Sequence, residues 1–562
     1  MNSFLAKIPI VEFVQHYCKF LNRRFILLNL ISGLSSTTIV ALVNNSASSN
    51  TASFDLSSFL IFAIVLVAYI YTTKTLMDIT FEVTEDSVDR VRQSLFKKLR
   101  LCDLEFFEQK GKEQVYSQIM KSTAIIAQTG AFILATGPEL ILIVLVYIYI
   151  FFLSKIAFLI CISMLTVAAT IFVRRTAEVE ACYQEAAEHD KQVGGNLNGL
   201  LFGFKECLLN SRRILDLSAS FFRTSGNLAE SRIDAGKNFS NSYAFVQIFF
   251  YVLIAIIVFI MPVFTQGYFG QSNMTFKLVA AIFFVFIPTA NLVRTLNYNT
   301  QVSVAIQGIW DLDRAIDKRL QENGIDVEGD KSEEVLNPPT FETLTMDGIF
   351  YSYYDSDHMS TFSAGPFTFE LKKGEVVFIC GGNGSGKTTF LKLLTGLYKP
   401  ERGIIKQDGT TVLFKYNNAY REIFAAIFSD FYIFQKLYGL FETDPAQTAE
   451  LLALFHLEHK TKREGDSFTN IELSTGQRKR LALIIALMED KPVYIFDEWA
   501  ADQDPIFREY FYLELIPRLK QEGKTIIAVS HDDRYYHCSD RVLHFQDGKI
   551  DKEIVNSENS PQ

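Results

Sequence analysis

The sequence predicts an α-helical membrane domain of six transmembrane helices fused to a soluble α/β domain. Of its 562 residues, 49% are hydrophobic and 21% are charged, and the mean hydropathy is +0.15. A water-soluble chain carries fewer apolar residues, so lipid must cover the excess. Long apolar stretches end near residue 296, and short apolar segments alternate with helical patterns only after residue 341. The two halves of the chain therefore belong to different classes of domain.

Each predicted span has about 20 residues, the length that crosses about 30 Å of hydrocarbon at 1.5 Å per residue. The six spans are Phe25–Val43, Phe59–Ile79, Thr129–Leu153, Ile156–Val173, Tyr243–Phe264 and Thr275–Leu296. We assign residues 1–320 to the membrane domain with two long cytoplasmic extensions, residues 321–340 to an acidic and polar linker, and residues 341–562 to the soluble domain.

Positive charges are distributed unevenly along the membrane half. The connection 44–58 contains no Lys or Arg, whereas the long segments after the second and fourth spans contain many. Because Lys and Arg stay on the cytoplasmic side of a membrane, both long segments, both termini and the soluble domain are expected in the cytoplasm.

Charge and cysteine content exclude some classes of protein. The net charge of −9 argues against a nucleic-acid partner, because a phosphate backbone requires a basic face. The seven cysteines form no CxxC pair. Neither a disulfide framework nor a zinc site is therefore expected.

A glycine-rich loop lies between an apolar strand and a helical pattern. It reads Gly381, Gly382, Asn383, Gly384, Ser385, Gly386, Lys387 and Thr388 and is followed by Thr389. This fits G-x-x-x-x-G-K-[ST], in which backbone N–H groups and a helix N-terminus bind phosphate oxygens. Lys387 is expected to reach the β- and γ-phosphates of a nucleotide, and the Thr388 hydroxyl to ligate Mg²⁺. The alternative is a plain glycine turn.

Two carboxylates end a second apolar strand, Val493–Phe496. Strands are depleted in acidic residues, so Asp497 and Glu498 are unusual at this place. Asp497 is expected to hold Mg²⁺, and Glu498 to polarise the water that attacks the γ-phosphate. The alternative is an ordinary strand end with solvated acids.

Two further segments carry candidate phosphate contacts. Leu473–Gln477 opens a basic helical pattern, and Ser474 suits the N-cap of that helix. The functional alternative is an anion site made by Ser474 and the Gly476 backbone. His531 directly follows a third apolar strand, Thr525–Val529, and is a candidate for contact with the γ-phosphate.

The order of these elements resembles the nucleotide-binding domain of an ATP-binding-cassette (ABC) transporter. Gly381–Thr388 resembles the Walker A loop of that family, Leu473–Gln477 its signature, and Val493–Glu498 its Walker B strand. The resemblance makes His531 the switch histidine, places Asp504 at the D-loop aspartate, and places Tyr353 where an aromatic ring stacks on adenine. It also implies that Ser474, Gly476 and Gln477 contact ATP. The membrane half resembles the six-helix domain of an ABC exporter.

A narrower resemblance links the chain to bacterial cyclic-peptide and siderophore-peptide exporters of the pyoverdine and syringomycin types. It rests on Leu473–Leu481 (LSTGQRKRL), Asp497–Pro505 (DEWAADQDP), Ser530–Arg534 (SHDDR) and Phe428–Phe431 (FSDF). Ser429 stands where most ABC proteins have a Gln that touches Mg²⁺ and the attacking water, so it is the third candidate metal ligand. Thr475 replaces the usual second Gly of the signature.

The resemblance implies a half-transporter of the bacterial inner membrane that works as a homodimer. Its cofactors would be ATP and Mg²⁺, and its partners would be a second copy, membrane lipid and a transported peptide-like or amphipathic substrate. Motion would pass to the spans near Gly111–Ser122 and Gly203–Asn210. The alternatives are a lipid or multidrug exporter and, from another class, a membrane-anchored regulatory ATPase that moves nothing.

One acidic residue lies deep inside the third predicted span. A carboxylate at such a depth costs about 2.5–3.5 kcal/mol, so Glu139 should face a wet cavity or a partner. Glu139 is expected either to line the substrate path or to make a structural hydrogen bond, for example to Asn291 or Gln247. Pro138 is expected to kink the helix beside it.

Overall fold

The computed structural model describes residues 9–18, 23–47, 55–261, 272–325, 340–354, 360–413 and 418–556. Most of the predicted linker, 326–339, therefore lies outside the described residues. The chain divides into two compact units, the first comprising residues 1–100 and 110–317, and the second residues 101–109 and 318–562.

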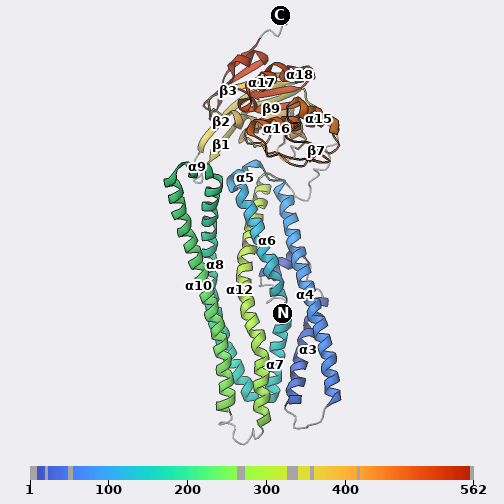
Figure 1. Cartoon of the computed structure of the whole chain (residues 1–562), viewed down its shortest axis with the longest axis vertical. Helices are drawn as coiled ribbons and strands as arrows, with labels where there is room; N and C mark the ends of the chain where they lie inside the picture. Colours follow the sequence, from blue (N-terminus) through green and yellow to red (C-terminus); the bar gives the residue numbers. More distant parts are fainter. Residues whose placement is uncertain are drawn as a thin grey trace. The chain divides into compact units, whose positions relative to one another are not determined.

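The first unit is built from helices, most of them long (Figure 1). They are α2 (Pro9–Tyr17), α3 (Arg23–Ala47), α4 (Leu56–Leu99), α6 (Lys112–Leu134), α7 (Gly137–Leu153), α8 (Lys155–Phe202), α9 (Phe204–Leu209), α10 (Ser211–Ala255), the π-helical turn η1 (Ile256–Ile260) and α12 (Ser272–Glu322). Polar residues in the connections fix where several of them begin. The Asp55 carboxylate accepts hydrogen bonds from the first amides of α4, and the Asn210 side chain does the same for α10. Such caps satisfy N–H groups that have no partner inside the helix.

The predicted spans fall on α3, on α4, on α6 and α7, on α8, on α10 with η1, and on α12. Among the described residues, the segments long and apolar enough to cross a membrane are Arg23–Ser46, Leu56–Leu99, Lys112–Leu153, Ser211–Ile260 and Met274–Glu322. The fourth predicted span lies on α8, where Lys155–Ala168 is a shorter apolar segment. The end of the fifth predicted span, residues 262–264, falls outside the described residues.

The third predicted span is interrupted. Helix α6 ends at Leu134, α7 begins at Gly137, and Pro138 lies in the first turn of α7. Proline lacks an N–H group and is tolerated in a first turn, where that group would have no helical partner. The expected kink is thus a break between two helices, and it places Glu139 at a helix start.

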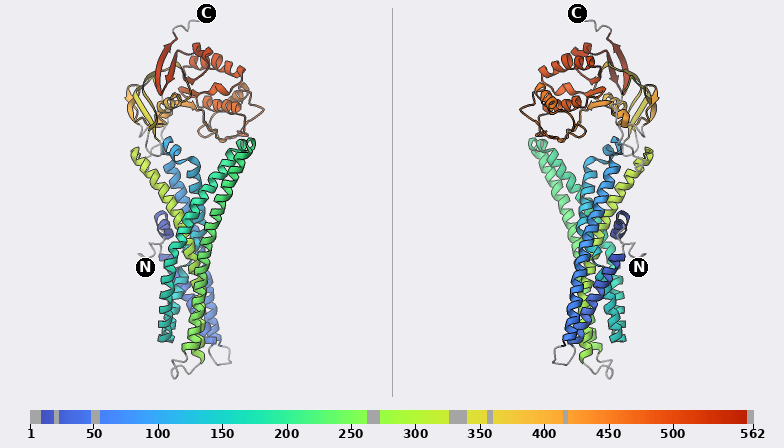
Figure 2. Two further views of the ribbon diagram at one scale, coloured as in Figure 1. Left: turned by 90° about the vertical axis from the view of Figure 1, so that its left-hand side faces the viewer. Right: turned by 90° about the vertical axis from the view of Figure 1, so that its right-hand side faces the viewer.

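Helices α8 and α10 run side by side in all views and diverge from α4, α6 and α12 towards α9 (Figures 1 and 2). A buried apolar cluster joins α7, α8, α10 and α12 and includes Val146, Phe250 and Ile282. Outward-facing apolar residues are strongly exposed, such as Ile64 at 70% and Val67 at 67%. Such surfaces suit contact with lipid or with another subunit.

Buried polar side chains also join the helices of the first unit. The hydroxyls of Ser32 and Thr73 lie 3.1 Å apart. The Asn44 amide donates to the Tyr149 hydroxyl at 3.2 Å and to the Lys277 carbonyl at 2.9 Å. Hydrogen bonds of this kind hold membrane helices together where the hydrophobic effect is weak.

The second unit contains a mixed six-stranded sheet and a smaller antiparallel sheet. The six-stranded sheet has the order β12-β11-β3-β10-β9-β6 and the smaller one the order β2-β1-β4-β5. The strands are β1 (Thr343–Tyr354), β2 (Ser360–Lys372), β3 (Val376–Gly381), β4 (Arg402–Gln407), β5 (Thr410–Thr411), β6 (Phe424–Ile427), β9 (Val493–Asp497), β10 (Thr525–Val529), β11 (Arg541–Gln546) and β12 (Lys549–Val555), with a separate pair β7 (Arg463–Glu464) and β8 (Ser467–Phe468).

The second unit also contains several short helices. They are α5 (Leu104–Lys110), α13 (Lys387–Leu394), α14 (Asn418–Arg421), α15 (Pro445–Leu454), α16 (Thr475–Glu489), α17 (Pro505–Tyr510) and α18 (Ile516–Gln521), with short turns η3 (Trp499–Asp502), η4 (Phe511–Leu515) and η5 (Asp533–Cys538). Val376 and Phe378 point into one apolar core, and the alternating Val377 and Ile379 into the other. Both faces of β3 are thus buried, which explains its unbroken apolar sequence.

The three predicted strands β3, β9 and β10 are confirmed, and they are neighbours in the order β3-β10-β9. They run parallel to one another. Their carboxyl ends therefore meet at one edge of the sheet, where ligands usually bind in sheets of this type. The glycine-rich loop follows β3, Glu498 follows β9, and His531 lies just beyond β10.

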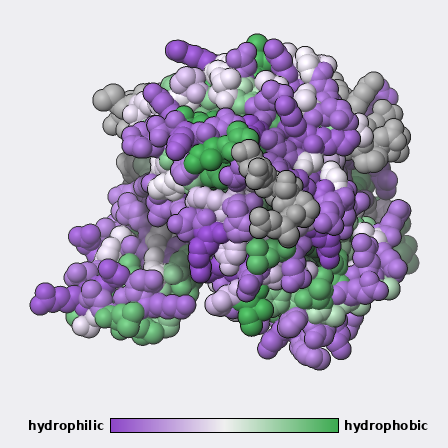
Figure 3. Space-filling view, turned by 90° about the horizontal axis from the view of Figure 1, so that it is seen from above, coloured by the Kyte–Doolittle hydropathy of each residue, from purple (hydrophilic) through white to green (hydrophobic). Residues whose placement is uncertain are grey.

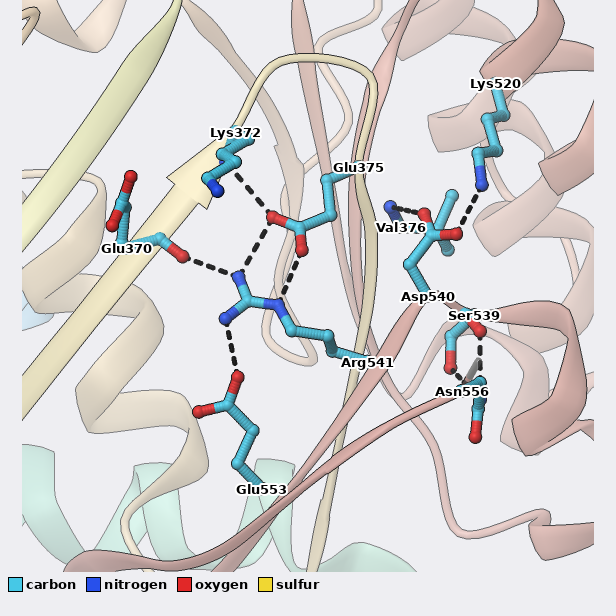
Figure 4. A network of polar contacts seen from close by, with 10 residues as sticks. All are labelled: Glu370, Lys372, Glu375, Val376, Lys520, Ser539, Asp540, Arg541, Glu553 and Asn556. Atoms are coloured by element: carbon cyan, nitrogen blue, oxygen red, sulfur yellow. Dashed lines mark hydrogen bonds and ion pairs between the residues drawn. The ribbon is translucent and has the colours of Figure 1, made fainter. Parts of the chain in front are cut away.

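The opposite edge is fixed by an ionic network around Arg541 (Figure 4). Its guanidinium donates to both Glu375 oxygens at 2.5 and 2.9 Å and to Glu553 at 2.6 Å. Beside it, Asp540 accepts from the Val376 amide at 2.9 Å and from Lys520 at 2.5 Å. These contacts tie the starts of β3 and β11 together, away from the glycine-rich loop.

The face drawn in Figure 3 is mostly hydrophilic, with separate apolar patches, which suits a surface in water.

Candidate active site

The glycine-rich loop needs glycine at two places in particular. Gly381 has φ +148°, and a Cβ there would lie 2.3 Å from the Phe545 carbonyl oxygen. Gly386 has φ +96° and is the N-cap of α13. A side chain would be strained at both positions. The glycines thus let the loop turn tightly from β3 into the start of α13.

The loop contains two buried polar side chains. Lys387 is buried, and its ammonium donates to the carbonyls of Gly381 and Gly382 at 3.0 Å each. The hydroxyl of Ser385 is buried and has no hydrogen-bond partner among the residues that the structure describes. A buried hydroxyl without a partner, an ammonium and a helix N-terminus together fit an anionic ligand such as phosphate.

Thr388 and Asp497 bring two hard oxygen donors together. The Thr388 hydroxyl donates to Asp497 Oδ2 at 3.1 Å, and Asp497 is only 2% exposed. Burial raises the pKa of Asp497, and the hydrogen bond from Thr388 opposes this shift. Mg²⁺ usually takes one or two protein oxygens and completes its octahedron with phosphates and waters. The pair therefore fits Mg²⁺, although no cluster of three acidic, His or Cys side chains occurs among the described residues.

Ser429 contacts the same carboxylate through its main chain. Its backbone N–H donates a hydrogen bond to Asp497 that lowers the pKa of this carboxyl group, and the Ser429 side chain is exposed. The segment after β6 thus reaches the candidate metal site without using the serine hydroxyl.

Glu498 and His531 form a pair at the end of the sheet. The Nε2 atom of His531 lies 3.0 Å from Glu498 Oε1. Glu498 has φ +54°, which is uncommon for a residue with a side chain. The Lys479 ammonium donates to the Glu498 carbonyl at 2.7 Å and holds this backbone. Strained residues of this kind are common at functional sites.

The signature segment forms a capped helix start, as one of the two interpretations predicts. The Gln477 amide donates to the Ser474 hydroxyl at 3.5 Å, and the Ser474 amide donates to Gln477 Oε1 at 3.3 Å. This reciprocal pair is a capping box. Ser474 and Thr475 are nevertheless exposed, so the helix start is open to a ligand or to another protein.

The residues after β9 connect the signature helix α16 to the Glu498 turn. A Cβ on Gly476 would lie 2.8 Å from the Asp502 carbonyl oxygen, so the two backbones approach closely. Gln503 donates to the Gly476 carbonyl at 3.2 Å. Asp504 caps α17 and pairs with Arg480 at 2.7 Å. Asp504 is thus fixed within its own chain.

Tyr353 lies beside the glycine-rich loop. Its hydroxyl is 3.2 Å from the Thr389 hydroxyl and 3.4 Å from the Tyr398 hydroxyl. Phe362 lies close to both Gly386 and the Tyr353 ring. The strands β1 and β2 therefore supply an aromatic wall next to α13.

Sequence reasoning missed Lys479, which is 4% exposed. It bonds to the Glu498 carbonyl and pairs with Asp502 at 2.7 Å. The sequence signal for Lys479 was its position in the basic run after the signature. The same run is equally typical of a solvated helix face. Burial of this single lysine depends on residues about 20 positions further along the chain.

Comparisons with known proteins agree with this geometry. The family model described as ABC transporter matches residues 365–501. The "ATP-binding protein SyrD" of Pseudomonas syringae pv. syringae is 30% identical over 94% of this chain and 93% of that protein. The chain belongs to the ABC transporter family. The "Thiamine import ATP-binding protein ThiQ" of Brucella abortus is 32% identical but covers 33% of this chain and 79% of that protein.

The fold of the whole chain matches a solved exporter. The "Structure of a bacterial Atm1-family ABC exporter with ATP bound" aligns with a TM-score of 0.74 and 18% identity, covering 95% of each chain. The predicted fold class, a six-helix ABC-exporter membrane domain followed by an α/β ATPase domain, is therefore confirmed. This ABC transporter is a membrane-spanning half-transporter of the exporter type, and its ATPase domain binds ATP and couples ATP hydrolysis to transport.

Proposed function

We propose that this ABC transporter exports a peptide-like compound, a cyclic or siderophore peptide, across the bacterial inner membrane as a homodimer. The observation that carries the ATP-driven part is the meeting of the glycine-rich loop, Asp497, Glu498 and His531 at one edge of the sheet. The peptide substrate rests on the resemblance to cyclic-peptide and siderophore-peptide exporters and on the relative SyrD.

The loop residues would bind the phosphates of ATP. The Lys387 ammonium carries three N–H donors. It can therefore retain its hydrogen bond to a loop carbonyl while it donates another to a phosphate oxygen. The Ser385 hydroxyl and the N-terminal amides of α13 would add further donors to the phosphate oxygens. Thr388 and Asp497, with Ser429 beside them, would hold Mg²⁺. When bound, Mg²⁺ neutralises charge that develops on the β- and γ-phosphates.

Glu498 would orient and polarise the attacking water, because its carboxylate follows the strand end that carries Asp497. His531 contacts that carboxylate directly and would hold it in place while its ring faces the γ-phosphate. Phosphoryl transfer depends mainly on positioning and charge stabilisation, and these two side chains provide both. Tyr353 would stack on adenine beside the loop.

A homodimer would complete the site. Ser474, Gly476 and Gln477 begin a helix whose first residues are exposed, and a helix N-terminus favours anions. By the family resemblance, this surface would face the ATP held by the Walker A loop of the partner subunit, with Asp504 nearby. Two identical subunits with two such sites form the simplest closed assembly. The two subunits would enclose a pathway between their spans.

The distribution of Lys and Arg supports an orientation with the ATPase domain and both termini in the cytoplasm. ATP would then be hydrolysed on the side where it is made, and the substrate would leave towards the other side. The domain boundaries of this proposal remain residues 1–320, 321–340 and 341–562.

The deciding experiment uses the purified full-length protein in liposomes. ATPase activity is measured with cyclic peptides, siderophores and lipids, and the far-side accumulation of each stimulating compound is followed. Stimulation and ATP-dependent accumulation of a cyclic or siderophore peptide would support the proposal. If only lipids or unrelated drugs accumulate, the transported substrate is a lipid or a drug and not a peptide. Regulated hydrolysis without accumulation of any compound would favour a membrane-anchored regulatory ATPase.

A further inference from the structure

The short helix α5 lies in the N-terminal half of the sequence but belongs to the second compact unit. Helix α5 lies between α4 and α6 in the chain, yet residues 101–109 belong to the same compact unit as residues 318–562. It lies immediately before the first of the two segments expected to pass motion to the spans. Leu104 packs against the apolar core that contains β1, β2 and α13.

Both ends of α5 are held by ionic contacts. At its start, Asp103 pairs with Arg319 at 2.8 Å, and Glu105 pairs with the same guanidinium. At its end, Glu108 accepts from Lys392 of α13 at 2.9 Å. These side chains are about two-thirds or more buried, so the contacts are better shielded than surface ion pairs.

The Glu108 contact continues as a chain of hydroxyl groups. The Tyr398 hydroxyl donates to Glu108 Oε2 at 2.5 Å. The Tyr353 hydroxyl donates to the Tyr398 hydroxyl at 3.4 Å and lies 3.2 Å from the Thr389 hydroxyl. Each hydroxyl can thus donate to the next in one direction, from Thr389 to the carboxylate. Hydrogen bonds aligned in this way polarise and strengthen one another.

The surroundings keep this chain in one arrangement. Tyr398 is 2% exposed, its ring stacks on Tyr351 with centroids 4.8 Å apart, and the Lys392 ammonium lies over it. Burial and the bond to Glu108 raise the pKa of Tyr398, so its hydroxyl stays protonated and remains a donor. Among the residues that the structure describes, the acceptor at the end of this series of hydroxyls is Glu108 of α5.

We propose that Glu108 is a positioning residue that, through Tyr398, sets the place of the Tyr353 ring and thereby links ATP affinity to helix α5. A shift of α5 would move the carboxylate, release the Tyr398 hydroxyl and loosen the aromatic wall beside the loop. The inference rests on the proposed contact of Tyr353 with adenine. Because α5 connects α4 to α6 along the polypeptide, this series of hydrogen bonds would give the spans a route to the base of ATP that is separate from its phosphates.

The test measures ATPase rate against ATP concentration for the full-length protein in liposomes. Tyr398→Phe keeps the ring but removes the hydroxyl, and Glu108→Ala removes the acceptor. Each should raise the KM for ATP about fivefold, the usual effect of one hydrogen bond, with kcat within about twofold. The KM for ATP of the double variant should be no higher than that of either single variant, because both substitutions break the same series of hydrogen bonds. Tyr353→Phe removes the hydroxyl that donates to Tyr398, and it should raise the KM for ATP by the same factor.

Matched controls distinguish loss of this series of hydrogen bonds from general destabilisation of the domain. Tyr354→Phe removes an exposed hydroxyl on the same strand and should leave the KM unchanged. Glu108→Gln keeps an oxygen acceptor for Tyr398 and should restore a KM close to that of the wild type. An unchanged KM in Tyr398→Phe and Glu108→Ala, or additive effects in the double variant, would overturn the inference.

A last variant distinguishes this inference from the proposed function on which it rests. Tyr353→Ala removes the ring itself. If it raises the KM while Tyr398→Phe does not, Tyr353 contacts adenine but the link to α5 is wrong. If Tyr353→Ala leaves the KM unchanged, the adenine contact itself is wrong, and the inference fails with it.

Discussion

The Nε2 atom of His531 lies 3.0 Å from the Oε1 atom of Glu498, although the two residues are 33 positions apart. The contact exists because β9 and β10 are parallel neighbours that end at the same edge of the sheet. It couples the position of the carboxylate to that of the imidazole.

The first prediction concerns Glu498→Gln. The substitution keeps an oxygen that can bond to His531 but removes the negative charge that would polarise the water. Hydrolysis should fall about 10²–10⁴-fold, while ATP binding persists because the glycine-rich loop is unchanged. ATPase rate and binding of labelled ATP to the same purified sample check this. A wild-type hydrolysis rate in this variant would show that Glu498 has another role.

The second prediction concerns His531→Ala. Removing the imidazole leaves the Glu498 carboxylate without its contact, so hydrolysis should fall about 10²-fold, as when one positioned donor is lost. Because His531 is proposed to act through the Glu498 carboxylate, the double variant with Glu498→Gln should be little slower than Glu498→Gln alone. Rates that multiply in the double variant would mean that the two residues act independently.

The third prediction concerns Ser429→Ala. The Ser429 contact with Asp497 uses the backbone N–H, which alanine retains, so ATPase activity should change less than about twofold. A tenfold fall corresponds to about 1.4 kcal/mol in the barrier. A fall of that size with preserved ATP affinity would establish the Ser429 hydroxyl as a ligand of Mg²⁺ or its water. Asp497→Asn is the matched control and should lose most activity.

Much of the candidate site could be predicted because its residues follow buried parallel strands. Strands such as β3 and β10 are apolar throughout, since both faces are covered, and they stand out in the sequence. The glycines, acids and histidine directly after them could therefore be placed at one sheet edge. Residues 505–521, between β9 and β10, form a helical segment that a π-helical turn, Phe511–Leu515, divides into α17 and α18.

The contacts between distant segments could not be predicted in the same way. Glu108 and Lys392 are 284 positions apart, and no periodicity in either segment indicates that they meet. Antiparallel strands β1 and β2 contain irregularities in their register, which disturb the alternation that would reveal them. The packing of α5 against the ATPase core follows from tertiary structure alone.

The fourth prediction concerns Arg541→Lys. The guanidinium bonds to Glu375, Glu553 and the Glu370 carbonyl at once, and a lysine ammonium cannot match that planar fork. Loss of one or two such bonds should cost about 1–3 kcal/mol, which lowers the melting midpoint of a domain of about 200 residues by about 2–4 °C per kcal/mol. Thermal inactivation checks this.

ATP affinity at low temperature is the control for Arg541→Lys. The network lies at the starts of β3 and β11, and the glycine-rich loop follows the other end of β3. The KM for ATP should therefore stay within about twofold while the variant is folded. A large rise in KM without a lower melting midpoint would contradict a purely structural role.

The last prediction concerns Glu139→Gln. Glu139 lies in the first turn of α7, and the Asn291 side chain of α12 donates to its Oε1 at 2.7 Å, so the expected structural hydrogen bond exists. Its other carboxylate oxygen is buried and has no partner among the described residues. A structural bond to Asn291 uses one carboxylate oxygen, and a carboxylate at this depth is costly unless it faces a partner or a wet cavity. The substrate-contact hypothesis assigns the second oxygen to a polar group of the substrate.

Gln at position 139 keeps the acceptor for Asn291 and removes the charge. We therefore expect basal ATPase activity within about twofold of the wild type, with substrate-stimulated ATPase and transport reduced about tenfold, because one lost charged contact is worth about that much. Asn291→Ala is the matched control: it removes the structural bond but leaves the charge, and it should lower stability more than transport by the folded protein. Unchanged transport and stimulation in Glu139→Gln, together with a loss of stability in Asn291→Ala, would assign Glu139 to helix packing alone.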